Sequence, residues 1–168
     1  AVKGKISVPI IGIIKNDLKD SKVRITPLLK DVDKVIKSGA DIIAFDATKR
    51  KRPFSTKEII SKIKKANRLA MADCSNLDDA KNAILEGVDI IGTTLAGYVG
   101  KQAKDTDEPN FKLVKQFRKL NCFVMAEGRY NSPKLAKKAM LAGADAVTVG
   151  SAITRIDNIT SWFVKEIT

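Results

Sequence analysis

Residues 38–46 read SGADIIAFD: a glycine, an aspartate, and then an apolar run that ends in a second aspartate. The same pattern returns in EGVDIIGTT (86–94) and in AGADAVTVG (142–150). Glycine is common just after the last turn of a helix, because it adopts the left-handed backbone conformation at no steric cost. A continuous apolar run is typical of a strand buried on both faces of a parallel sheet. Each repeat therefore predicts that a helix ends and a buried strand begins.

Six apolar runs divide the chain. They cover residues 8–14, 40–46, 69–73, 88–95, 122–127 and 144–150. The segments 27–38, 56–66 and 77–86 between them space their apolar residues as amphipathic helices do. Alternation of buried strands with helices is typical of a doubly wound sheet or of a (β/α) barrel.

Local signals predict where several helices begin. STKE (55–58) has the pattern of a capping box, in which a serine and a glutamate three residues later bind each other's backbone N–H groups. Ser132 and Pro133 are typical of an N-cap followed by a first turn, and Pro109 suits the first turn of another helix. Asp157 is predicted to cap the last helix.

The ends of the predicted strands favour the barrel. No glycine-rich GxGxxG turn follows the first strand, which argues against a dinucleotide-binding sheet. Polar residues or glycines instead follow every strand: Lys15, Asp46, Asp73, Thr93, Thr94, Glu127, Arg129, Gly150 and Ser151. In a barrel these ends converge on one mouth, where active sites lie. We therefore expect an α/β protein of the (β/α)8 TIM-barrel class, with a single domain over residues 1–168.

The number of units falls short of a closed barrel. Eight β-α units and roughly 200 residues or more are usual for this fold, whereas the 168 residues here contain six units. Either two units precede Ala1, so that the domain is incomplete at its N-terminus, or the sheet is open and its first strand has an unpaired edge.

Composition removes several classes of function. The chain has no histidine, which excludes Ser-His-Asp triads, Cys-His pairs and histidine-based zinc sites. Cys74 and Cys122 are expected to be buried free thiols in a reducing cytoplasm. The net charge of +12 comes from lysines spread over helix surfaces, and an aromatic content of 5% is too low for a nucleic-acid stacking platform. No apolar run approaches the ~20 residues of a membrane span, and no signal peptide is visible.

Acid–base chemistry must then come from other side chains. Lys15 follows the apolar stretch VPIIGII, where partial desolvation would favour a basic amine that abstracts a proton or forms a Schiff base. Glu127 occupies the same position after its own strand. A lysine and a glutamate that face each other across a mouth make a reasonable acid–base pair, although each is also compatible with a purely structural role.

The last two units predict a phosphate site. EGRYNSP (127–133) and TVGSAITR (148–155) both lead into helical turns, and barrels often hold phosphate with these two loops. We expect the backbone at Gly150 and Ser151 to contribute N–H groups, and Arg129 and Arg155 to add charge-assisted bonds.

Two aspartates remain. Asp73 is predicted to bind a sugar hydroxyl, to orient Lys15 or to cap a helix. Asp46 is predicted to hold Arg50 and Arg52 in a loop at the rim, which is a structural role.

In their order and spacing these motifs resemble one family. VPIIGIIKNDLKDSKVRITP, ADIIAFDATKRKRP, AMADCSNLDDA, DIIGTTLAGY, VMAEGRYNSP and AVTVGSAITR are similar to the successive strand-end motifs of bacterial N-acetylmannosamine-6-phosphate 2-epimerases. The resemblance covers essentially the whole chain and matches strands 3 to 8 of the family pattern, so two units that family members carry at the front are absent from these residues.

The resemblance implies an isomerase that interconverts N-acetylmannosamine 6-phosphate and N-acetylglucosamine 6-phosphate, in amino-sugar and sialic acid breakdown. It implies a cytoplasmic homodimer with no metal and no organic cofactor. The catalytic lysine and glutamate of the family fall on Lys15 and Glu127. Its substrate and phosphate contacts fall on Asp73, Arg129, Gly150, Ser151 and Arg155.

Other readings stay open at this point. One is a different phosphate-binding barrel enzyme, such as an aldolase that forms a Schiff base on Lys15. Another is a non-catalytic fragment that binds a phosphosugar, or that binds a partner protein through the open edge. A nucleic-acid-binding module is the least favoured, because no recognised motif accompanies the charge.

Overall fold

The computed structural model describes residues 3–100 and 108–168. Within these residues six strands pair in parallel, each beside its neighbour in the sequence. They are β1 (Ile11–Gly12), β2 (Ile42–Asp46), β3 (Leu69–Asp73), β4 (Ile90–Gly92), β5 (Phe123–Glu127) and β6 (Ala146–Thr148). Each lies inside one of the predicted apolar runs, so the strand assignment is confirmed.

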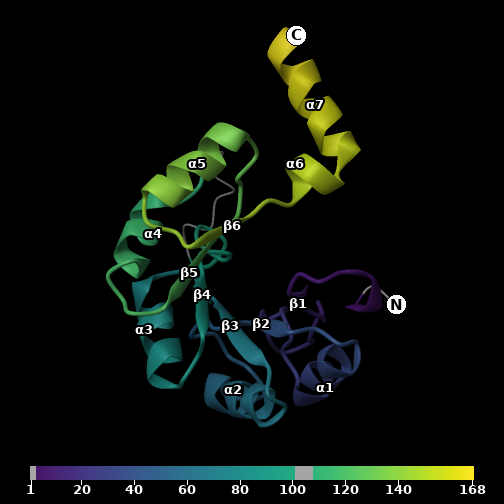
Figure 1. Ribbon diagram of the computed structural model, residues 1–168, viewed down its shortest axis with the longest axis vertical. Coiled ribbons are helices and arrows are strands. Elements are labelled where there is room, and N and C mark those ends of the chain that lie inside the picture. The colour runs from purple at the N-terminus through teal and green to yellow at the C-terminus, as the bar shows by residue number, and fades with distance from the viewer. Residues whose placement is uncertain (1–2, 101–107) are drawn as a thin grey trace.

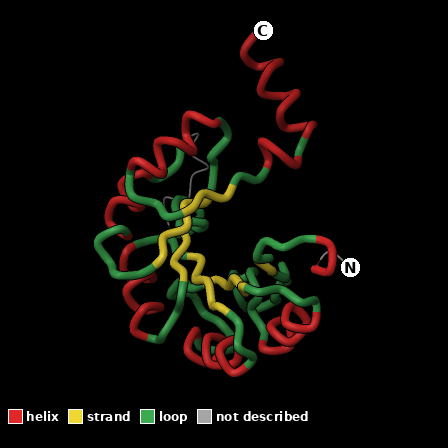
Figure 2. Tube along the Cα trace, in the orientation of Figure 1, coloured by secondary structure: helices red, strands yellow, loops and turns green. Residues whose placement is uncertain are grey.

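Helices alternate with the strands. They are α1 (Leu29–Lys37), α2 (Thr56–Lys65), α3 (Leu77–Leu85), α4 (Phe111–Phe117), α5 (Pro133–Leu141), α6 (Ser151–Thr154) and α7 (Ile156–Ile167), and a short 3₁₀ turn, η1 (Lys3–Lys5), precedes β1. Figures 1 and 2 show the strands in an arc with α1 to α5 along its outer side. In the described residues β1 and β6 do not pair, so the arc stays open. The predicted α/β class is confirmed as six β-α units of a TIM barrel.

Most of the predicted helix starts are confirmed. Ser55 and Glu58 form the full capping box of α2, and the Ser132 side chain caps α5 with Pro133 in the first turn. Two predictions were wrong. Pro109 lies outside α4, because Asn110 takes the capping position. Arg155 stands at the N-cap position of α7 without a side-chain capping bond, and Asp157 lies in the first turn of that helix, where it pairs with Arg155.

The sheet separates two apolar layers. The larger one fills the space between the strands and α1 to α5, whereas a small inner cluster comprises Ile42, Ala44, Met71, Ile90 and Met125. Side chains alternate along a strand, so residues two positions further on share the inner face. Asp46, Asp73, Gly92 and Glu127 stand two positions after members of the inner cluster. The strand pattern therefore points these residues toward the interior of the arc.

The glycine–aspartate repeat lies at the other end of the strands, just before their amino ends. Gly39, Gly87 and Gly143 all have positive φ (86°, 91° and 104°), as the repeat predicts. The aspartate that follows each glycine accepts a hydrogen bond from the backbone N–H at the start of the neighbouring strand. These bonds run from Ile10 to Asp41 (2.9 Å), from Ala70 to Asp89 (2.8 Å) and from Val124 to Asp145 (2.8 Å).

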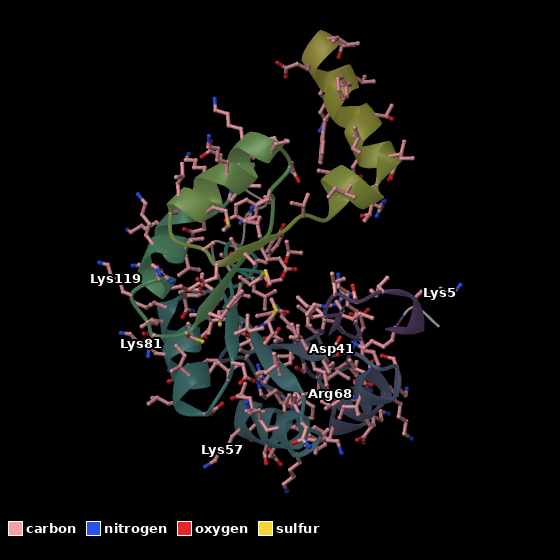
Figure 3. All side chains as sticks on the ribbon, in the orientation of Figure 1. Lys5, Asp41, Lys57, Arg68, Lys81 and Lys119 are labelled. Carbon is pink, nitrogen blue, oxygen red and sulfur yellow. The ribbon has the colours of Figure 1, made fainter. Side chains whose placement is uncertain are left out.

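The outer surface carries the predicted lysines. Lys57, Lys81 and Lys119 are exposed and point away from the arc (Figure 3). Both cysteines are free thiols, with Cys74 buried and Cys122 half-buried. Among the helices of the described residues, none has the length and apolar character to cross a membrane.

Candidate active site

A cavity of about 590 Å³ opens at the carboxyl ends of the strands. Its lining includes five of the seven residues predicted for the site: Lys15, Glu127, Arg129, Gly150 and Ser151. Asp73 and Arg155 do not line it. A cavity of about 620 Å³ at the opposite ends of the strands has no comparable chemistry, because its Arg118 and Asp145 are paired with each other.

Asp73 lies beneath the cavity, at the end of β3. Its side chain is 3% exposed, and its Oδ1 accepts a hydrogen bond of 2.6 Å from the Thr94 hydroxyl, which does line the cavity. Burial, and then the negative charge of Glu127, raise the pKa of Asp73 well above its usual range. Such a carboxyl group retains a proton at a pH where most aspartates are ionised.

Glu127 ends β5, and Thr93 fixes its backbone. The Glu127 N–H donates to the Thr93 hydroxyl (3.0 Å), which donates in turn to the Glu127 carbonyl oxygen (2.9 Å). Burial raises the pKa of the Glu127 carboxyl, while the Thr94 hydroxyl and the charge of Lys15 act in the opposite direction. The Glu127 carboxyl at the strand end is thus held in place and partly shielded from water.

Lys15 is more accessible than predicted. The sequence suggested a partly desolvated amine, but the residue is exposed, because β1 is only two residues long and forms an edge of the sheet. Its positive charge lowers the pKa of both Asp73 and Glu127, although burial remains the larger influence on each. Lys15 and Glu127 both line the cavity, and they do not form a direct ion pair in the described part of the chain.

Arg129 joins two loops at the mouth. It has a φ of 64° and follows Gly128, whose φ is 100°. Its guanidinium donates to the carbonyl oxygens of Ala96 (2.7 Å) and Glu108 (3.3 Å), and lies 4.8 Å from the centre of the Tyr98 ring. These contacts hold the guanidinium at the cavity wall, where it faces the cavity from the side of β4 and β5.

The other phosphate candidates lie after β6. Gly150 precedes α6 and Ser151 is its first residue, and both border the cavity. Arg155 lies beyond α6, exposed and paired with Asp157. The structure thus brings the Gly150–Ser151 turn into the site and leaves Arg155 outside the cavity wall.

The rim loop after β2 forms as predicted. The buried Asp46 carboxylate accepts hydrogen bonds from Arg50, from Arg52 (3.3 Å) and from the Thr48 backbone and hydroxyl (2.9 and 2.6 Å). This network confirms the structural role of Asp46. It also directs Arg50 to the cavity, which sequence reasoning did not anticipate.

Sequence reasoning also missed Lys22 and Arg24, which line the mouth. They belong to the segment between β1 and α1, which is folded back by an antiparallel bridge between Lys15 and Ile25. The length of this segment was a usable signal, because β-to-α loops usually have only two to six residues. No group of three or more acidic or cysteine side chains in the described residues has the spacing of a metal site.

Comparison with known proteins identifies the family of this chain. The model of the NanE family, described as "Putative N-acetylmannosamine-6-phosphate epimerase", matches residues 1–168. The chain belongs to this family. A relative of the same description from Haemophilus influenzae is 50% identical over 167 residues, which are 99% of this chain and 72% of that protein. One from Vibrio vulnificus is 57% identical over 157 residues, or 94% of this chain and 69% of that protein.

A solved NanE-family structure agrees with the fold. The N-acetylmannosamine-6-phosphate 2-epimerase from Clostridium perfringens is 40% identical and superposes with a TM-score of 0.93, covering 98% of this chain and 73% of that one. A FabK variant from Thermotoga maritima, at 19% identity, gives a TM-score of 0.62 over 90% of this chain and 46% of that one. The second likeness concerns the fold alone.

Proposed function

We propose that this chain is an epimerase that interconverts N-acetylmannosamine 6-phosphate and N-acetylglucosamine 6-phosphate. The observation that carries the proposal is the joint presence of Lys15, Glu127 and the Gly150–Ser151 turn in one cavity of a NanE-family fold. The two sugars differ only at C2. In the open-chain form C2 lies next to the aldehyde carbon, so its proton is acidic enough for a positioned base to remove it.

Each group has a part in this reaction. Inversion at C2 requires that one group removes the proton and that a proton returns on the opposite face. Lys15 and Glu127, which both line the cavity, perform these two transfers. The Gly150–Ser151 turn binds the phosphate through backbone N–H groups and the Ser151 hydroxyl, and Arg129 adds positive charge. Asp73 acts on the substrate or on Glu127 from below, and Arg155 reaches the phosphate if it leaves Asp157.

The test uses heavy water. We expect the purified chain, given N-acetylmannosamine 6-phosphate, to form the gluco epimer with deuterium at C2, as followed by proton NMR. Lys15→Ala and Glu127→Gln should each lower turnover by about 10²-fold to 10⁴-fold while the protein stays folded, because each removes one proton-transfer group. Near-normal turnover in either variant would refute its role.

A control separates this reaction from Schiff-base chemistry. Borohydride in the presence of substrate should leave the mass of the protein unchanged, because no imine forms on Lys15. A stable adduct on Lys15 would instead support an aldolase.

We further propose that the enzyme works as a cytoplasmic homodimer in sialic acid breakdown. A dimer is supported by α6 and α7, which bury none of their residues and expose Ile153, Ile156, Phe163 and Ile167 by 69–80%. Figure 1 shows α7 standing away from the arc. Sedimentation equilibrium should give twice the chain mass of 18.3 kDa. The free thiols of Cys74 and Cys122 are compatible with a reducing compartment.

A further inference from the structure

Thr94 lies beside the buried Asp73 carboxyl and borders the same cavity as the half-buried Glu127. In the sheet Asp73 pairs with Gly92, and Gly92 pairs with Met125. Thr94 follows β4 by two residues and Glu127 ends the adjacent β5, and both border the cavity. The Thr94 hydroxyl donates to Asp73 Oδ1 at 2.6 Å, lines the same cavity as Glu127, and acts to lower the pKa of the Glu127 carboxyl. One hydroxyl thus acts on both acids.

Counting hydrogens restricts this arrangement. A threonine hydroxyl has one hydrogen to donate and accepts through its lone pairs. It cannot donate to two carboxylates at once, so it can serve both acids only if one of them is protonated and donates to Thr94 Oγ1. Burial agrees with this, because it raises the pKa of both Asp73 and Glu127, and two neighbouring carboxyl groups away from water do not both ionise readily.

We propose that Thr94 is a positioning residue through which Asp73 and Glu127 share one proton. In one state Glu127 is protonated and donates to Thr94 Oγ1, whose hydrogen is donated to the Asp73 carboxylate. In the other state the Glu127 proton has moved to Thr94 Oγ1, and the original hydroxyl hydrogen has moved to Asp73. Two protons shift, the total charge is unchanged, and Thr94 is again a neutral hydroxyl.

The inference rests on the proposed epimerase function. It gives a reason for the presence of Asp73 beside the two proton-transfer groups, Lys15 and Glu127. An epimerase runs in both directions, so a residue that removes the proton in one direction must donate it in the other. The shift through Thr94 converts Glu127 between its acid and base forms without any exchange with solvent. Asp73 is the store that makes this conversion possible.

Gly92 provides the space for this contact. A Cβ atom at this position would lie 3.1 Å from Thr94 Oγ1, 3.4 Å from Asp73 Oδ1 and 2.9 Å from Met71 Cε. The methionine end is flexible and the carboxyl oxygen would be in ordinary contact, but the Thr94 hydroxyl would have to shift. The absent side chain of Gly92 therefore allows Thr94 to remain within hydrogen-bonding distance of Asp73.

The first test compares Thr94→Val, which keeps the shape and removes the hydroxyl, with Thr94→Ser, which keeps the hydroxyl. For Thr94→Val we expect kcat to fall about tenfold or more with little change in KM, below the roughly 10²-fold effect of removing a proton-transfer group itself. The carboxyl limb of the kcat–pH profile should move to higher pH, because the hydroxyl no longer stabilises a carboxylate. Thr94→Ser should restore both. A lower kcat with an unmoved profile, or no change in kcat, would overturn the proposal.

A second measurement does not depend on turnover. Carboxyl ¹³C NMR of the folded protein, assigned with Asp73→Asn and Glu127→Gln, should show two coupled titration steps that both move to higher pH in Thr94→Val and return in Thr94→Ser. If these steps appear but no epimer forms, the proposed function fails and the Thr94 bridge stands. If epimer forms while Thr94→Val leaves both titrations unchanged, the bridge fails alone.

Discussion

Asp145 and Asp73 lie at opposite ends of the strands: Asp145 just before the start of β6, and Asp73 at the end of β3. The Asp145 carboxylate accepts hydrogen bonds from the Val124 N–H (2.8 Å) and from Arg118 (3.2 Å). The buried Asp73 carboxyl has the Thr94 hydroxyl beside it, together with the negative charge of Glu127. The first aspartate is paired and partly exposed, and the second is buried close to another acid.

The difference shows that the two ends of each strand have different roles in the β-α unit. The glycine and aspartate repeat at the amino ends of the strands, where each carboxylate accepts a hydrogen bond from a backbone N–H of the neighbouring strand. At Asp41, for example, the hydrogen bond from Lys3 and then the N–H of Ile10 lower the pKa of the carboxyl. At the carboxyl ends the residues differ from strand to strand, and burial raises the pKa of Asp73. Stability comes from the repeated amino ends and chemistry from the varied carboxyl ends.

The largest effect on stability is expected at the amino ends of the strands. Asp145→Ala leaves the Val124 N–H without its acceptor, which should cost about 1–3 kcal/mol of unfolding free energy. Asp33→Ala, which removes only the exposed ion pair with Lys62, should cost about 1 kcal/mol or less. Urea unfolding gives both values. Turnover per folded molecule should be unchanged in both variants, and equal costs would show that the repeat is not a stability device.

The fold was predictable because its signals are local and repeated. Each strand is a continuous apolar run, and each glycine of the repeat has the positive φ that ends a helix. The helix caps at Ser55 and Ser132 depend on neighbours within three residues, so the sequence contains all that they need. The predicted cap at Asp157 was wrong because the chain passes directly from α6 through Arg155 into α7, which begins at Ile156, one residue before Asp157.

The site was less predictable because its contacts are long-range. That Lys15 and Glu127 share a cavity follows from the rule that strand ends converge, but the exposure of Lys15 depends on β1 forming an edge. The role of Thr94 could not be inferred from its own strand, because it arises from the register of β3, β4 and β5. The contacts of Arg129 with Ala96 depend on the course of a loop, which periodicity does not describe.

The next effect is a difference between Asp73 and Asp41 in how each makes stability depend on pH. A group whose pKa is higher in the folded state than in the unfolded state stabilises the fold fully below the unfolded pKa, near 3.9 for aspartate, and loses this contribution as the pH rises through the folded value. Asp73 is such a group. Asp73→Asn should therefore flatten the fall of Tm as the pH rises above about 4.

Asp41 provides the control of opposite sign. Because its pKa is lowered in the fold, its contribution is present above the unfolded pKa and is lost as the pH falls. Asp41→Asn should flatten the acid side of the Tm profile and leave the neutral side alone. The same profile for both variants would mean that the two ends of the strands do not differ in the way proposed.

The smallest expected effect is the difference between substitutions at two glycines of the glycine–aspartate repeat. Gly87 and Gly143 both have positive φ (91° and 104°), so an alanine at either position is strained by roughly 1–2 kcal/mol. A Cβ at Gly87 would meet open space, whereas one at Gly143 would lie 2.7 Å from Cγ of Arg118, the partner of Asp145. Gly143→Ala should thus cost more than Gly87→Ala by up to about 1 kcal/mol, the worth of a surface ion pair. Equal costs in urea unfolding would show that Arg118 moves aside freely.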